Sequence, residues 1–229
     1  MKKKTWIIIA ITVVAIIVAG VVTFFTYDAM QEVILRQEAA KIGKLDITEE
    51  NIDTKIKTTG KYAVIEQTMK DYMNEYSIKC KEVIGMMKDE KLAKILTAEN
   101  YKKDGPEFTN SREYIATSKE QFNGKINTLI DMTSEEKMKE AIEGKKLEAE
   151  DIELYYELML GEEKTLDLEE TVETLQESAK SINNIYDVQE KVLNLLTTNK
   201  GKWEVNDDGE IEFSTQSLVD QYNNLISSL

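Results

Sequence analysis

Histidine is absent from this 229-residue sequence, and cysteine and proline occur only once each. Without histidine the chain lacks the usual general base at neutral pH, the commonest zinc ligand and the base of Ser-His or Cys-His nucleophile pairs. The single cysteine, Cys80, excludes an intramolecular disulfide. One proline leaves little to interrupt helices, so the composition predicts a mainly α fold.

The usual cofactor and metal motifs are also missing. There is no P-loop, no glycine-rich dinucleotide loop and no cluster of cysteines at metal-binding spacing. The segment 206–209, Asn-Asp-Asp-Gly, is too short for a calcium loop and is typical of a hairpin turn. The sequence has 29 basic and 43 acidic residues, which gives a net charge of −14. That charge repels phosphate backbones and argues against nucleic-acid binding. We therefore expect no catalytic, cofactor-binding or metal-binding residues.

Charge is entirely absent between Trp6 and Phe25, a run of 20 residues. A helix of about 20 residues matches the hydrocarbon thickness of a bilayer. Lys2, Lys3 and Lys4 precede the run, and the positive-inside rule places them in the cytoplasm. The sequence thus predicts a cytoplasmic segment 1–5, a single-pass transmembrane signal-anchor helix 6–27, and an extracytoplasmic remainder.

A cleaved signal peptide is the alternative interpretation of the same segment. Its basic start would look the same, but its apolar region is usually shorter and ends at small residues. Phe24-Phe25-Thr26-Tyr27 is a poor cleavage site by that rule. The two interpretations remain open at this point.

The remaining residues have the length of one domain or two small ones. We expect a juxtamembrane helix and linker over 28–47 and an extracytoplasmic helical domain over 48–229. A composition rich in Lys, Glu, Ile and Asn, together with the bare anchor, suggests a bacterial, Gram-positive cell envelope.

Two long helices are predicted from apolar periodicity. The first covers about 49–88, with Thr48 as its N-cap, and its apolar stripe contains Cys80, which we therefore expect to be buried and inert. The second covers about 168–196 with nearly four heptads, a pattern shared by coiled coils and helical bundles. The heptad positions are Leu168, Val172, Leu175, Ala179, Ile182, Tyr186, Gln189, Leu193 and Leu196.

Alternating residues predict a small β-hairpin at about 202–214, followed by a terminal helix. Trp203 and Val205 share one face of the first strand, and Ile211 and Phe213 share one face of the second. Because an isolated hairpin is marginal in water, this apolar face should pack on the helices.

Aromatic residues are the candidate partner-binding groups: Tyr62, Tyr72, Tyr76, Tyr155, Tyr156 and Trp203. Tyrosine on an amphipathic stripe is also ordinary core filling with the hydroxyl at the rim. The expected function is a non-catalytic, membrane-anchored binding or scaffolding protein. It would contact the bilayer through 6–27, a protein partner in the envelope, and, as a further option, copies of itself. The alternatives are an extracytoplasmic sensor or ligand-binding domain acting through a membrane partner, and a carboxylate-based envelope hydrolase.

Overall fold

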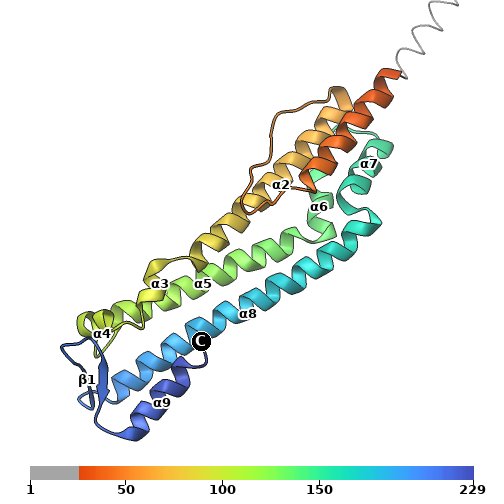
Figure 1. The fold of residues 1–229 in the computed structure, drawn as a ribbon. Coiled ribbons are helices and arrows are strands. Elements are labelled where there is room, and N and C mark those ends of the chain that lie inside the picture. The colour runs from red at the N-terminus through yellow and green to blue at the C-terminus, as the bar shows by residue number, and fades with distance from the viewer. Residues whose placement is uncertain (1–25) are drawn as a thin grey trace, which may run out of the picture. The chain divides into compact units, whose positions relative to one another are not determined.

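The computed structural model describes residues 26–229, apart from the side chains of residues 162–167. The described chain is mainly helical, and its elements are shown in Figure 1. A first helical stretch covers residues 26–42. The elements that follow are α2 (Gly60–Met87), α3 (Glu90–Lys94), α4 (Ala98–Asp104), α5 (Thr109–Met132), α6 (Glu135–Ile142), α7 (Ala149–Leu160), α8 (Glu162–Thr198), β1 (Trp203–Val205), β2 (Ile211–Phe213) and α9 (Gln216–Ile226).

The predicted membrane span falls almost wholly outside this region. Only its last two residues, 26 and 27, are described, and both lie in the first helical stretch. Within residues 26–229, no helix combines the length and apolar character that a bilayer crossing requires. The predicted helical class, hairpin and terminal helix are confirmed.

The chain divides into two compact units, each built from two separate stretches. Among the described residues, unit 1 comprises 26–77 and 138–164, and unit 2 comprises 78–137 and 165–229. The boundaries fall inside α2, α6 and α8, so the backbone passes from one unit to the other within helices.

Unit 1 contains an extended segment where the sequence pattern predicted helix. The helix expected from about residue 49 begins only at Gly60. Residues 46–50 form turns in which Asp46 accepts hydrogen bonds from the backbone and hydroxyl of Thr48. Residues 51–59 have no regular secondary structure. We call residues 51–59 the strap. Side chains of neighbouring helices accept hydrogen bonds from part of its backbone, so these amides have partners although the strap is not helical.

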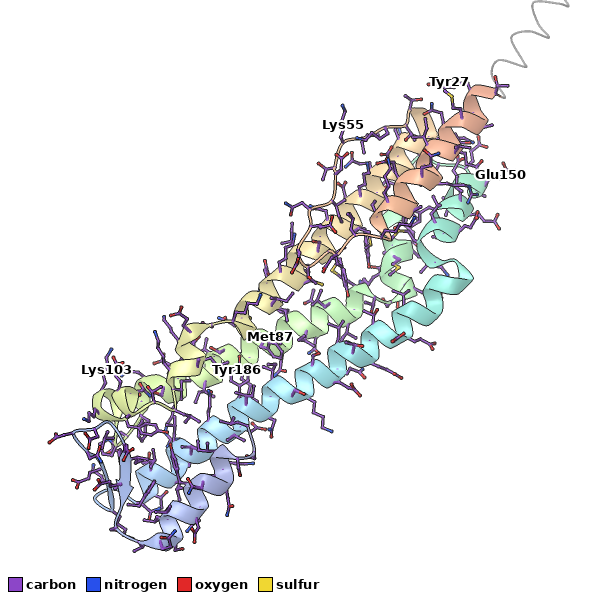
Figure 2. All side chains as sticks on the ribbon, viewed as in Figure 1. Tyr27, Lys55, Met87, Lys103, Glu150 and Tyr186 are labelled. Atoms are coloured by element: carbon purple, nitrogen blue, oxygen red, sulfur yellow. The ribbon has the colours of Figure 1, made fainter. Side chains whose placement is uncertain are left out.

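Unit 2 contains the predicted heptad helix. The positions from Ile182 onward are buried, whereas the four earlier ones are half-buried. Phe122 of α5 and Tyr186 of α8 lie with ring centroids 6.2 Å apart. Figure 2 labels Tyr186, which lies between these two helices. Leu193 and Leu196 are completely buried, so the C-terminal half of α8 is a central element of this core.

The hairpin lies where the sequence predicts it, with the predicted turn. β1 and β2 are antiparallel, with Trp203 opposite Phe213 and Val205 opposite Ile211. Gly209 has a φ of 81°, which only glycine adopts readily. All four apolar hairpin residues are half-buried, and the Trp203 indole donates a hydrogen bond to the Leu196 carbonyl, 2.7 Å away. The hairpin therefore packs on α8, as two strands alone could not be stable.

The prediction of a deeply buried Cys80 is wrong: this residue is half-buried. The stripe on α2 keeps its spacing, but its depth changes along the helix. Ile65 and Met69 are buried, while Met87, at the end of α2, is 43% exposed. Periodicity identifies the face of a helix, whereas burial depends on what covers that face.

Candidate functional site

Two of the predicted aromatic residues lie in the core of unit 1. Tyr62 is 5% exposed, and its hydroxyl donates to the Asp28 carboxylate at 3.1 Å. Tyr155 is fully buried, and its hydroxyl donates to the Met138 carbonyl at 3.0 Å. Burial raises the pKa of both tyrosines. These two hydroxyls serve internal hydrogen bonds.

The other members of the aromatic set are half-buried, and the Tyr156 ring meets the Tyr155 ring edge-on with centroids 6.0 Å apart. Tyr72, Tyr76 and Tyr156 belong to unit 1, where the Lys139 ammonium lies 5.4 Å from the centre of the Tyr156 ring. Trp203 belongs to unit 2. The predicted partner-binding residues are thus divided between two units, and part of the set is core.

A buried ionic cluster in unit 1 is the principal feature that the sequence reasoning missed. Lys70 is 1% exposed, and its ammonium contacts Glu66 at 2.7 Å and Glu38 at 2.9 Å. The third ammonium proton is directed to the Lys55 carbonyl, 2.8 Å away. Glu38 also pairs with the solvent-exposed Lys41 at 2.5 Å. We call Glu38, Glu66 and Lys70 the ionic triad.

The triad is charged despite its burial. Burial is the largest influence and opposes ionisation of all three groups, but their hydrogen bonds outweigh it. These bonds hold the pKa of Lys70 above its ordinary range and the pKa values of Glu66 and Glu38 below theirs. A buried charge is tolerated only where partners satisfy it in this way.

Glu66 also fixes the strap. Its carboxylate accepts from the backbone amides of Lys57 and Thr58 and from the Thr58 hydroxyl, at 2.8–3.1 Å. Gln31 accepts from the Thr59 amide at 2.8 Å. Figure 2 shows Lys55 on this segment. The triad therefore joins the first helical stretch, α2 and the strap, which is a structural role.

One signal for the triad was present in the sequence. Glu66 and Lys70 are four positions apart and directly follow Ile65 and Met69 of the apolar stripe. A Glu–Lys pair at that spacing is usually a solvated surface pair. Glu38 lies 32 positions before Lys70 in the sequence, so only the folded chain reveals the third member.

Unit 2 holds an aromatic cluster in place of charges. Trp203 stacks on Phe108 with ring centroids 6.0 Å apart, and Tyr101 meets both rings edge-on. The hydroxyls of Tyr101 and Tyr222 are 3.0 Å apart. Phe108 has a left-handed backbone, φ 56°, which is uncommon for a residue with a side chain. A Cβ on Gly105 would lie 2.4 Å from the Tyr101 carbonyl oxygen, so only glycine fits there.

In the core of unit 2, one buried polar side chain has a hydrogen-bonding atom without a partner among the described residues. Gln189, the polar heptad position, is 4% exposed and donates from Nε2 to the Leu92 carbonyl at 2.9 Å. Its Oε1 atom has no hydrogen-bond partner among the described residues. A buried acceptor left unpaired costs about 1–3 kcal/mol.

A polar cavity of about 390 Å³ lies in unit 2 beside α3, α4 and α5. Lys91 and Lys103 make no ion pair with any described carboxylate, and Lys94 pairs only with the exposed Glu90 at 3.3 Å. Figure 2 labels Lys103. The full lining is Lys91, Lys94, Ile95, Thr97, Glu99, Asn100, Lys103, Asn110, Ser111 and Tyr114. Three lysines and one carboxylate, Glu99, line this cavity, and the Lys91 ammonium lies 5.8 Å from the centre of the Tyr114 ring, so the lining has a small excess of positive charge that can attract a small anion.

A second cavity of about 370 Å³ in the same unit brings two carboxylates together. Glu120 and Glu190 line it with Arg112 and Lys119. Both glutamates are exposed. A glycosidase acid is usually enclosed by apolar groups, and the described lining includes no aromatic side chain. This cavity gives the hydrolase alternative little support.

Within the described part of the chain, no group of three or more Cys, Asp or Glu side chains is arranged to hold a metal ion. Comparison with protein-family models, curated proteins and solved structures finds no match to this chain.

Proposed function

We propose that this chain is a non-catalytic binding or scaffolding protein, anchored in a bacterial cell membrane by residues 6–27, with residues 28–229 outside the cytoplasm. The uncharged run from Trp6 to Phe25 and the preceding lysines support the anchor and its orientation. The bacterial, Gram-positive assignment rests on composition.

One observation supports a non-catalytic role more than any other. Three charged groups that are at most 5% exposed, Lys70, Glu66 and Glu38, are bound to one another and to the strap. Catalytic groups with shifted pKa values normally face a cleft that a substrate can enter. Here the shifted groups are consumed by internal bonds, as in a structural element.

Membrane extraction tests the anchor. The full chain should stay in the membrane pellet in alkaline carbonate, and protease added outside intact cells should digest residues beyond 28. A variant with Val14→Lys and Ile17→Lys should leave the pellet, because a charged residue at the centre of a span costs about 2.5–3.5 kcal/mol. Recovery of a soluble chain beginning near residue 28 would instead identify a cleaved signal peptide.

The polar cavity favours a second candidate, an extracytoplasmic ligand-binding domain that signals through a membrane partner. Among the described residues Lys91 and Lys103 make no ion pair, although Asp89 lies near Lys91 and Glu99 lines the same cavity; in a chain of net charge −14, these lysines suit a small carboxylate or phosphate. Calorimetric titration with citrate and with inorganic phosphate tests this. Binding should be lost in Lys91→Met/Lys103→Met and retained in Lys191→Met, an exposed lysine on α8. If neither anion gives a measurable heat of binding, the ligand-binding hypothesis is contradicted and the scaffolding hypothesis is favoured.

A further inference from the structure

The helical stretch 26–42 has two faces of different character. One face packs inside unit 1, where Leu35, Ala39 and Ile42 are at most 7% exposed and Gln31 and Glu38 are buried. Figure 1 shows this stretch beside the first part of α2 and beside α7. The other face has no partner among the described residues of its unit.

That outer face carries a row of four uncharged residues, with Lys41 beside its end. Met30 and Val33 are 53% and 52% exposed, and Gln37 and Ala40 are exposed as well. We call these four residues the seam. They follow one another at steps of three, four and three residues, which is the a/d spacing of a coiled coil. Isolated exposed apolar residues are ordinary; here Met30 and Val33 lie in one row with two further uncharged side chains.

The charges that border the seam are already paired within unit 1. Arg36 binds Glu32 at 2.8 Å and Glu157 at 2.7 Å. Lys41 binds Glu38 at 2.5 Å. A second identical surface can therefore approach the seam without bringing unpaired like charges together.

The chain outside the described region indicates what covers the seam. The uncharged run ends at Phe25, five residues before Met30. If residues 6–27 are the anchor proposed above, every copy holds its seam at the same height above the membrane and in the same direction. Two copies then meet as parallel helices with identical residues opposite one another.

We propose that a second copy of this chain pairs with the seam in a parallel, in-register coiled coil that continues outward from the membrane anchor. Gln37 lies opposite Gln37 of the other copy, where each amide can both donate and accept. A polar a-position of this kind fixes register in coiled coils. Four seam residues are too few for a stable dimer in solution, so confinement in the membrane supplies the effective concentration. The proposal rests on the anchor.

Cysteine crosslinking of the full chain in membranes tests the pairing. In a Cys80→Ala background, Val33→Cys and Ala40→Cys place thiols on the seam, and Glu153→Cys places one on an exposed position of α7 in the same unit. Mild oxidation should give at least about tenfold more disulfide dimer from the seam variants than from Glu153→Cys, because pairing raises the local thiol concentration. Adding Val33→Glu to Ala40→Cys should lower the dimer yield about tenfold through like-charge repulsion. Adding Glu153→Gln should not change it.

The outcomes separate this proposal from the one on which it rests. Equal dimer yields at Val33→Cys and Glu153→Cys, no dimer at all, or crosslinks of Val33→Cys to a protein of another mass would overturn self-pairing. Carbonate extraction of the same membranes reports the anchor independently. A chain that stays in the pellet but gives equal dimer yields at seam and control positions would support the anchor and contradict the pairing. Seam-specific dimers from a chain that carbonate extracts would support the pairing and contradict the anchor.

Discussion

The buried polar groups of the two units differ in charge. Unit 1 buries the ionic triad, in which all three ammonium protons of Lys70 and the carboxylates of Glu66 and Glu38 have partners. Among its described residues unit 2 buries aliphatic and aromatic side chains, the hydroxyls of Ser111 and Thr133, and one amide, Gln189, whose Oε1 is unpaired. The comparison teaches that burial alone does not measure what a polar residue does. The triad defines how three segments meet, whereas Gln189 makes one hydrogen bond to a neighbouring segment.

Removing the charge of Lys70 should have the largest effect. Lys70→Met leaves two carboxylates facing each other in the core, and breaking a buried ion pair typically costs about 3–5 kcal/mol. Hydrogen exchange of the full chain, followed by mass spectrometry, should show faster exchange in peptides from the strap and α2. Lys94→Met, which removes only the exposed pair with Glu90, should cost less than about 1 kcal/mol. Similar exchange in the two variants would show that the triad is not structural.

Removing the hairpin anchor should have the next largest effect, and in unit 2. Trp203 is half-buried, so Trp203→Ala should cost roughly 2–3 kcal/mol, less than the about 3–5 kcal/mol of a fully buried aromatic. Faster exchange is expected first in peptides covering residues 186–213. Trp203→Phe keeps the ring but loses the bond to the Leu196 carbonyl, and should cost about 1 kcal/mol. Unchanged exchange with a loss of partner binding would make Trp203 a surface residue.

Acid should weaken unit 1 through the triad carboxylates. Their folded pKa values lie below the ordinary 4.5, so their contribution is complete above pH 4.5 and is lost as the pH falls through the folded values. Lys70 behaves oppositely: its pKa is raised above 10.5, so its contribution is complete below pH 10.5 and is lost above it. Protection of strap peptides, that is, the slowing of exchange relative to the intrinsic rate of an unfolded peptide at the same pH, should therefore fall at both ends of the pH range. Glu66→Gln should reduce the acid response; an acid response identical to that of the unchanged chain would contradict this assignment.

The smallest effect is expected where a polar group contributes least. Gln189→Met removes one hydrogen bond but also the unpaired Oε1, so the change in stability should be within about 1 kcal/mol in either direction. The Leu92 carbonyl keeps a bond from the Ile95 amide. Together with Lys70→Met, this gives the same replacement residue in each core. A loss of several kcal/mol at Gln189 would remove the contrast between the units.

Sequence reasoning recovers unit 2 better than unit 1. The heptads from Leu168 to Leu196, the turn before Gly209 and the alternation around Trp203 are local signals, and each predicted an element that is present. The strap and the triad depend on contacts across the sequence, such as that between Glu38 and Lys70. No local period encodes such contacts, so the apolar pattern of α2 predicts a helix start near residue 49 where the chain is in fact extended. Residue type alone does not distinguish core Tyr155 from half-buried Tyr156, because the two are neighbours in the sequence.

The backbone crosses between the two units three times, so unit 1 cannot finish folding until its second stretch, which follows residues 78–137, has been synthesised. Arg36 and Lys61 are synthesised early, but their partners Glu157 and Asp151 come from α7, after the whole of residues 78–137. At about 5–20 residues per second, that delay lasts several seconds. During this interval the surface of unit 1 that α7 later covers is exposed to solvent. A chain exported while it is being made would need a chaperone or the translocation machinery to shield that side until α7 arrives.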